Sequence, residues 1–186
     1  MVLACALVVL TSYASFASPA LAVAGEAQGP AIDFRPMRAL FGSWNCIGQG
    51  EGNVRHVSTT TYALTLSGRW LHVHVFSPPY ASRSWVLESD GYITFDRNRK
   101  KWIAIFFANE GGYSVLHSDG WHGQDFVWHS GPPPTFDDYR EIVQLTKPTQ
   151  YQMTIRQRSA TANFQTVAVG VCRRGTPTGR QQRKHA

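Results

Sequence analysis

The sequence lacks the short motifs that mark the common enzyme classes. It contains no His-Glu-x-x-His zinc motif, no Cys/His cluster and no Gly-x-Ser-x-Gly nucleophile elbow. Its glycine groups at 48–52 and 111–112 have no strand–loop–helix context, so they form neither a phosphate loop nor a dinucleotide fingerprint. These absences argue against zinc proteases, α/β-hydrolases and nucleotide-dependent enzymes.

Helical periodicity is also missing, apart from one or two turns at residues 34–41. Short runs of alternating or β-branched residues follow one another instead, separated by turns that contain glycine. We place these runs at residues 40–50, 54–66, 70–76, 84–87, 91–95, 102–107, 113–117, 124–129, 139–145, 151–156 and 164–172. The pattern predicts an all-β fold, a single closed antiparallel up-and-down barrel of about ten strands.

Cysteine is scarce, and its positions support closure of the barrel. Only Cys46 and Cys172 lie outside the first 22 residues, the former in the first predicted strand and the latter at the end of the last. Cys46 shares a strand face with Trp44, which we expect to plug one end of the barrel next to Gly42. Because first and last strands are neighbours in a closed barrel, we predict a Cys46–Cys172 disulfide.

The first 22 residues carry no charge and end in Ala20-Leu21-Ala22, the pattern of a signal peptide with its cleavage site. A cut after Ala24 is the alternative. Serine, threonine and proline interrupt the apolar run, which favours a cleaved signal over a membrane anchor. We therefore predict a secreted or periplasmic protein with no transmembrane span after processing, and a flexible linker at 23–39 with at most one short helical turn.

The net charge of +6 arises at the C-terminal end of the chain. Five Lys or Arg and no acid follow Cys172, whereas the remainder has 13 basic and 12 acidic residues. This division predicts a folded barrel domain at 40–173 and a basic, disordered tail at 174–186. A disordered, solubilising tail is the favoured interpretation, and weak attraction of the tail to anionic surfaces is the functional alternative. The folded part shows no basic face with interleaved aromatic residues, so we predict no nucleic-acid binding.

Several short motifs resemble those of a bacterial lipocalin-like (calycin-type) domain family of unknown function, whose members are small and often exported. The motifs are Phe41-Gly42-Ser43-Trp44, Ser67-Gly68-Arg69-Trp70-Leu71, Gly91-Tyr92-x-x-Phe95-Asp96 before Trp102, Ser118-Asp119-Gly120, and Tyr139-Arg140. The resemblance spans residues 40–172. It implies a closed antiparallel barrel with an interior of ligand size.

A more distant likeness is to nitrobindin-type haem barrels, which open with Gly-x-Trp-x-Gly-x-Gly. Here Cys46 replaces the middle glycine of that opening. No histidine stands in a late strand to bind iron, since His185 lies in the tail. The sequence therefore disfavours haem, and we predict no cofactor.

His72 and His74 lie two residues apart in one predicted strand and so share a face. Two imidazoles so placed suit a metal, but further ligands from other strands are not evident, and we predict no metal site. We expect the face that carries them to point into the barrel, although the opposite face (Leu71, Val73 and Val75) is purely aliphatic. The predicted ligand pocket consists of Trp70, His72, His74, Phe76, Trp102, Phe106 and Trp128.

These observations predict an exported barrel that binds a small, largely apolar ligand without changing it. One alternative is an enzyme on the same barrel, with pocket histidines as general acid and base. Another is a structural envelope protein whose barrel is filled with side chains. The sequence predicts no catalytic residue.

Overall fold

The computed structural model describes residues 30–50, 53–81, 83–130, 139–158 and 163–175. The predicted signal peptide and nearly all of the predicted tail lie outside these residues. One compact unit begins at Ala31. Its elements are the 3-10 helix η1 (Arg35–Leu40) and the strands β1 (Gly42–Gln49), β2 (Arg55–Thr65), β3 (Trp70–Ser77), β4 (Leu87–Asp96), β5 (Lys101–Ala108), β6 (Tyr113–Ser118), β7 (Trp121–His122), β8 (Asp125–Ser130), β9 (Tyr139–Lys147), β10 (Gln150–Arg158) and β11 (Phe164–Arg174).

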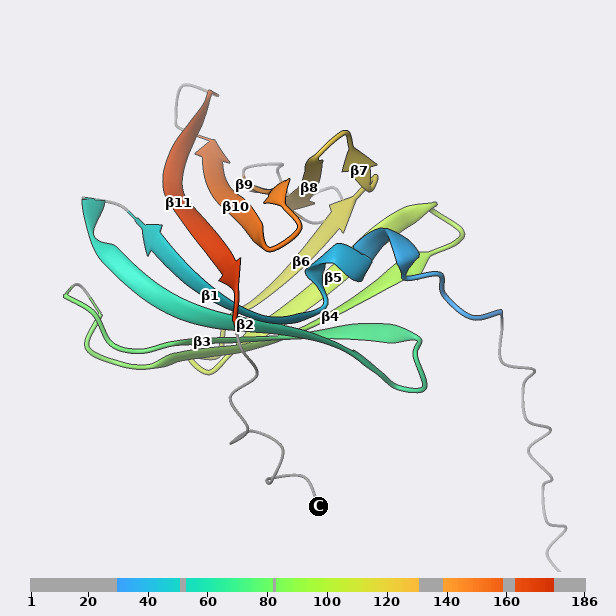
Figure 1. Ribbon diagram of the computed structural model, residues 1–186, viewed down its shortest axis with the longest axis horizontal. Coiled ribbons are helices and arrows are strands. Elements are labelled where there is room, and N and C mark those ends of the chain that lie inside the picture. Colours follow the sequence, from blue (N-terminus) through green and yellow to red (C-terminus); the bar gives the residue numbers. More distant parts are fainter. Residues whose placement is uncertain (1–29, 51–52, 82, 131–138, 159–162, 176–186) are drawn as a thin grey trace, which may run out of the picture. The chain divides into compact units, whose positions relative to one another are not determined.

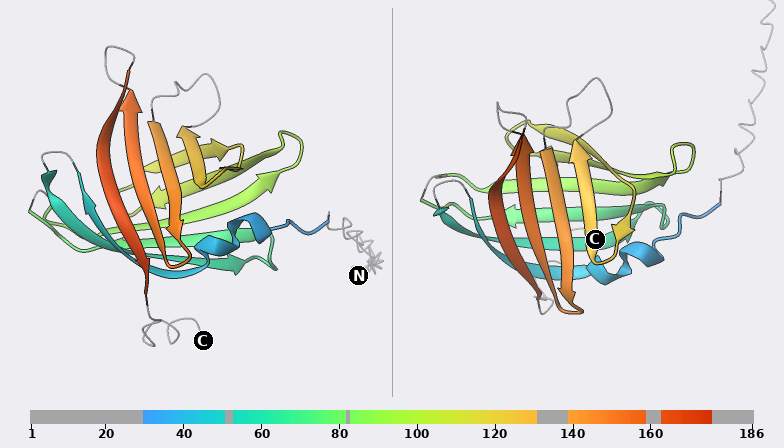
Figure 2. Two further views of the ribbon diagram at one scale, coloured as in Figure 1. Left: turned by 45° about the horizontal axis from the view of Figure 1, so that its top comes forward. Right: turned by 90° about the horizontal axis from the view of Figure 1, so that it is seen from above.

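Every pair of neighbouring strands is antiparallel, in the order β6-β5-β4-β3-β2-β1-β11-β10-β9-β8-β7. A further pairing of β6 with β8 closes the sheet, so ten strands form a closed barrel and the short β7 is an extra strand. Figures 1 and 2 show β8–β11 crossing the direction of β2–β5. The predicted fold class is confirmed. No helix among the described residues is long and apolar enough to cross a membrane.

The η1 helix covers one end of the barrel, which we call the closed end. The indole of Trp44 donates to the carbonyl oxygen of Leu40 at 2.7 Å, and the indole of Trp121 donates to that of Pro36 at 2.7 Å. Met37 and Leu40 of η1 are buried in the core. The sequence analysis placed Met37 in the linker at 23–39, with at most one short helical turn, and Leu40 at the start of the barrel. In the structure both apolar side chains pack into the barrel and complete its core.

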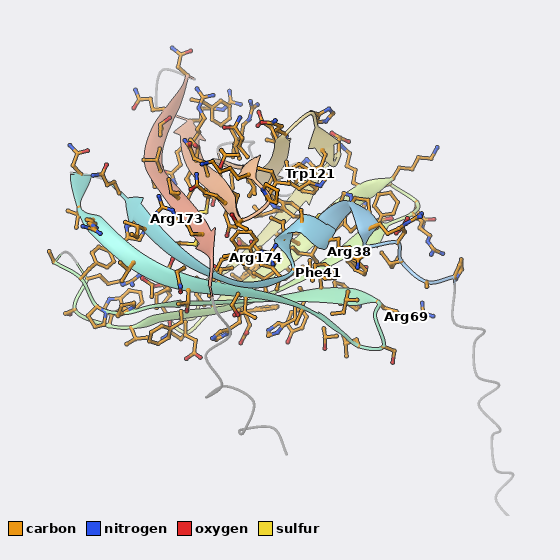
Figure 3. The ribbon with its side chains drawn as sticks, viewed as in Figure 1. Arg38, Phe41, Arg69, Trp121, Arg173 and Arg174 are labelled. Carbon is orange, nitrogen blue, oxygen red and sulfur yellow. A yellow bond between two sulfur atoms is a disulfide. The ribbon has the colours of Figure 1, made fainter. Side chains whose placement is uncertain are left out.

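Arg174 anchors the chain at the same end (Figure 3). Its guanidinium donates to the carbonyl oxygens of Phe41 at 2.6 Å and Ala39 at 3.0 Å, and lies 4.5 Å from the ring centroid of Trp44. A side chain in place of Gly42, which has a φ of +100°, would meet this guanidinium at 3.1 Å. Arg174 is therefore the last residue of β11. The sequence analysis had placed it as the first residue of the tail.

The core of the closed half is aromatic and is joined by the disulfide. Cys46 and Cys172 face each other directly in the β1–β11 pair and are bonded, which confirms the predicted disulfide. Beside them, the rings of Trp44 and Tyr151 lie edge to face with centroids 4.8 Å apart. Both rings are almost fully buried. Trp44 therefore closes this end of the barrel as expected.

Candidate functional site

The orientation predicted for β3 is wrong. Leu71 and Val73 point into the core, with Val73 only 2% exposed, whereas Phe76 on the other face is 38% exposed. The reason is volume. Large rings from other strands, among them Trp44 and Phe126, already occupy the interior, so compact aliphatic side chains fit where β3 crosses it.

His72 and His74 consequently lie on the outer face of the barrel, where β4 supplies a carboxylate. Asp90 Oδ1 lies 2.7 Å from Nε2 of His72 and 3.1 Å from Nδ1 of His74. Burial alone would raise the pKa of Asp90, but the hydrogen bonds from the two histidines outweigh it and hold that pKa below 3.8. Among the described residues no group of three or more His, Cys, Asp or Glu is arranged to hold a metal ion.

The structure separates the predicted pocket residues into two groups. Trp102 and Trp128 are buried in the core. Phe106 lies on the inner face, where its ring covers Gly91 so closely that a Cβ at Gly91 would clash with it. Trp70 is on the outer face, half-buried, together with the two histidines and Phe76. Three of the seven residues therefore share the interior, and four do not.

The inner face is filled at the closed end and open to solvent toward the other end, where β1, β3, β5, β8 and β10 finish. Inward-facing residues near η1 are almost fully buried: Trp44, Leu71, Phe126 and Val143. Nearer the other end they are only half-buried: Val75, Phe106, Tyr139, Glu141, Met153 and Ile155. We call this second half the open end. Solvent reaches the interior there.

Glu141 lies on the inner face of β9 near the open end. Alternation along β9 places it on the same side as Tyr139 and the buried Val143, opposite Trp128 of β8 and Ile155 of β10. The Tyr139 hydroxyl donates to Oε2 of Glu141 at 3.3 Å. Burial raises the pKa of Glu141 above 4.5, and the hydrogen bond from Tyr139 only partly opposes this. Among the described residues no Lys, Arg or His contributes to that pKa.

The charge of Glu141 also acts on two further tyrosines, Tyr62 and Tyr151. Burial raises the pKa of Tyr62 well above 10, and interactions with Tyr151 and Glu141 raise it further. The pKa of Tyr151 is also raised, first by burial, while hydrogen bonds from Tyr62 and Thr60 oppose the rise. At neutral pH these tyrosines are therefore uncharged, and among the described residues only Tyr139 donates to Glu141.

Glu141 was not singled out from the sequence, although it lies within the strand predicted at 139–145. A signal was present in the alternation of Tyr139, Glu141 and Val143, because one acid interrupts an otherwise apolar strand face. Asp137 and Asp138, the acids that precede Tyr139, lie outside the described residues.

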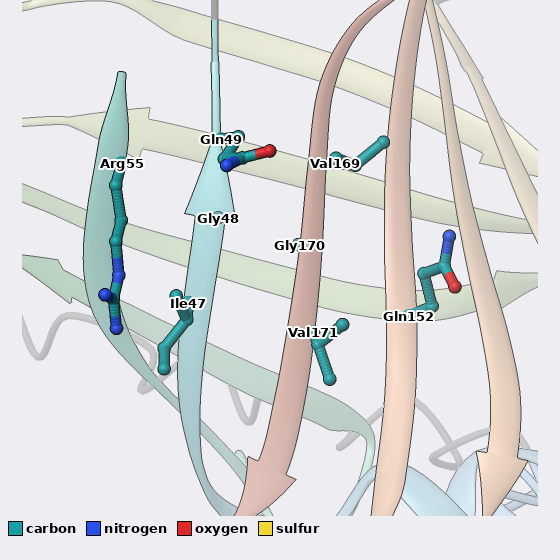
Figure 4. A pocket seen from close by; sticks show the side chains of 8 residues that line it. All are labelled: Ile47, Gly48, Gln49, Arg55, Gln152, Val169, Gly170 and Val171. Atoms are coloured by element: carbon teal, nitrogen blue, oxygen red, sulfur yellow. The ribbon is translucent and has the colours of Figure 1, made fainter. Parts of the chain in front are cut away.

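A second concavity lies on the outer wall of the barrel (Figure 4). It has a volume of about 410 Å³, and its apolar side chains come from Ile47, Val169 and Val171, with Arg55 among its polar ones. Gly48 and Gly170 pair directly across β1 and β11 at this point. The depression is part of the outer surface and does not reach Glu141, so we do not include it in the site.

Comparisons with known proteins support the fold alone. No protein-family model matches the sequence, and no curated protein matches it. Rv2717c from M. tuberculosis has a similar structure, with a TM-score of 0.57 and 13% identity over 77% of this chain and 97% of that one. This likeness supports a lipocalin-like barrel fold.

Two designed proteins are also similar. One is a redesigned β-barrel, b11L5F_LGL (TM-score 0.44, 13% identity, 76% of this chain and 96% of that one). The other is a de novo designed fluorescence-activating β-barrel (TM-score 0.41, 11% identity, 74% of this chain and 95% of that one). TM-scores this low carry no argument about this chain.

Proposed function

We propose that this protein binds a small, largely apolar ligand in the open half of its barrel, and that Glu141 receives a cationic group of that ligand, such as an amine. The ligand is held and not altered. The observation that carries the proposal is an inward-facing carboxyl group that accepts a hydrogen bond from the Tyr139 hydroxyl and, among the described residues, has no counter-ion.

The surroundings of Glu141 favour a cation over a neutral partner. Tyr139 donates its hydroxyl proton to the carboxyl group, an arrangement that stabilises the ionised form. What the site needs for a stable carboxylate is positive charge, since an isolated buried charge is costly. Apolar residues such as Phe106 and Ile155 suit the rest of an amphiphilic ligand.

The half-buried inner residues of the open end favour this proposal over a barrel filled with side chains. The position of His72 and His74 disfavours an enzyme based on pocket histidines, because both side chains lie on the outer face and contact Asp90 there. We further propose that the protein is exported and belongs with the lipocalin-like family that its motifs resemble. A disulfide between Cys46 and Cys172 suits an oxidising compartment.

A matched set of ligands tests the proposal. Octyltrimethylammonium, octanol and octanoate share one chain and differ in the charge of the head group. Titration calorimetry at pH 7 is expected to give the tightest binding for the cation. Glu141→Gln removes the charge but keeps the shape, and should weaken binding of the cation by about 10- to 100-fold, the value of a charge-assisted contact. Binding of octanol should not change.

Glu110→Gln is the matched control, because Glu110 is an exposed carboxylate in the turn between β5 and β6. It should bind all three ligands as the unmodified protein does. If none of the three ligands binds, the barrel is not a ligand carrier of this kind. If octanol binds and the cation has no advantage that Glu141→Gln removes, ligand binding stands and the role of Glu141 is wrong.

A further inference from the structure

The closed end of the barrel carries a concentration of positive charge on its folded part. Three segments meet there: 31–41 with η1, 64–70 at the β2–β3 turn, and 96–101 at the β4–β5 turn. Together they contain seven Lys or Arg and two Asp. Segment 31–41 forms one shallow pocket with Leu64 and Gly68 and another with Phe95 and Arg97, so the segments adjoin. The basic excess therefore is not confined to the residues after Cys172.

The acids of these segments do not neutralise the surface. Asp33 is paired with Arg35 at 2.7 Å, and Asp96 with Arg99 at 3.3 Å. Lys101 is paired with Asp119, which follows β6, at 2.9 Å. Arg38 of η1 and Lys100 of the β4–β5 turn are exposed and have no acidic partner among the described residues. Arg38 lies over the closed end, beside Phe41 (Figure 3).

Exposed leucines stand beside this charge. Leu66, at the tip of the β2–β3 turn, is 61% exposed, and Leu64 before it is 49% exposed. Leu66 has a φ of +47°, a conformation that a large apolar residue rarely adopts. Polar residues such as Asn occupy such a position at lower cost, so the fold alone does not account for a leucine there. Leu64 also lines a pocket of about 240 Å³ with Arg35 and Arg38.

We propose that the closed end docks on an anionic lipid surface, with Leu66 and Leu64 entering the boundary between head groups and acyl chains and the basic residues, including Arg38 and Lys100, facing the lipid phosphates. Binding to a membrane interface is strengthened both by apolar side chains that enter it and by basic residues that attract anionic lipids. A nucleic acid is the other common polyanion, but it would favour exposed aromatic rings or base-edge contacts over aliphatic side chains. Docking at this end leaves the open end, and its path to Glu141, facing away from the lipid.

Co-sedimentation with lipid vesicles tests this proposal with the purified, disulfide-bonded protein. Vesicles of phosphatidylcholine alone are compared with vesicles that contain 30% phosphatidylglycerol, in 50 and 300 mM NaCl. We expect binding only to the anionic vesicles, and weaker binding in high salt. Arg38→Gln and Lys100→Asn should each reduce binding about fivefold, the loss of one basic residue near such a surface. Leu66→Asn should reduce it about tenfold, and because Asn suits a positive φ, the variant should fold at least as well.

Two matched variants serve as controls. Arg38→Lys keeps the charge and should retain binding, and Arg55→Gln removes an exposed arginine near the open end and should change nothing. Equal binding to neutral vesicles, or no response to the closed-end variants, would overturn the proposal. Binding to a DNA duplex with comparable affinity, lost in Arg38→Gln but kept in Leu66→Asn, would assign the surface to nucleic acid instead.

Discussion

Val73→Ala is the most direct test of which face of β3 points into the barrel. Val73 is 2% exposed and lies between Tyr62 on β2 and Gly91 on β4. Gly91 has no side chain of its own and is already covered by the ring of Phe106, so it cannot fill the space that two lost methyl groups leave. His72 and His74, on the other face, have side chains that are 31% and 24% exposed.

The magnitude follows from the volume and surface removed. Two buried methyl groups are worth about 0.8 kcal/mol each in transfer free energy. A cavity of roughly 50 Å³ that does not collapse adds about 1 kcal/mol at 24 cal/mol per Å³. We therefore expect Val73→Ala to lower the free energy of unfolding by about 2–3 kcal/mol. His72→Ala or His74→Ala loses only a half-exposed contact with Asp90, for which we expect roughly 0–1 kcal/mol.

Guanidinium unfolding at 25 °C, followed by far-UV circular dichroism, measures these differences with the disulfide intact. Thermal melts should agree, with Val73→Ala lowering Tm by roughly 4–12 °C for a domain of this size. The reasoning is refuted if Val73→Ala costs less than the histidine variants. In that case the aliphatic face is the outer one and the histidines lie in the interior.

Other predictions concern the disulfide, Glu141 and the C-terminal end of the chain. Cys46→Ser with Cys172→Ser should lower the free energy of unfolding by up to about 5 kcal/mol, since the disulfide spans 126 residues; unfolding with and without reductant measures it. Burial raises the folded-state pKa of Glu141 above 4.5, so the unfolded state ionises first as pH rises. Stability should therefore decline from about pH 4.5 upward to that raised pKa, and unfolding curves of Glu141→Gln across pH should lack this decline. Ending the chain after Gly175, whose amide donates to the carbonyl oxygen of Ser43, should leave Tm unchanged, whereas ending it before Arg174 should lower Tm.

The barrel and its disulfide could be predicted because each rests on local information. Alternating residues and glycine turns define strands one at a time, and ten antiparallel strands in sequence leave few ways to close. The pairing of Cys46 with Cys172 then follows from the adjacency of the first and last strands. Local patterns were less informative where β4 begins. The sequence suggested separate runs at 84–87 and 91–95, but one strand runs through Ser89 and Asp90 because both pair with β3 and β5.

The interior could not be predicted in the same way, because the inner face of one strand depends on what the others contribute. Considered alone, the aromatic and histidine face of β3 suited a ligand pocket. In the structure, rings from Trp102, Trp128 and Phe126 supply the apolar volume, and β3 contributes only aliphatic side chains. An acidic group of the interior, Glu141, lies instead on β9, where the sequence analysis singled out only the Tyr139-Arg140 motif.

The two ends of the barrel differ for a reason that begins in the sequence before the first strand. Met37 and Leu40 place apolar side chains over one end, and Arg174 fixes the backbone of Phe41 and Ala39 against the end of β11. This cover buries the inner residues near it, whereas the inner residues toward the opposite end are only half-buried. The ligand site that we propose therefore lies in the half that contains Glu141. The covered end, which needs no opening, is free to carry the charge and exposed leucines of a docking surface.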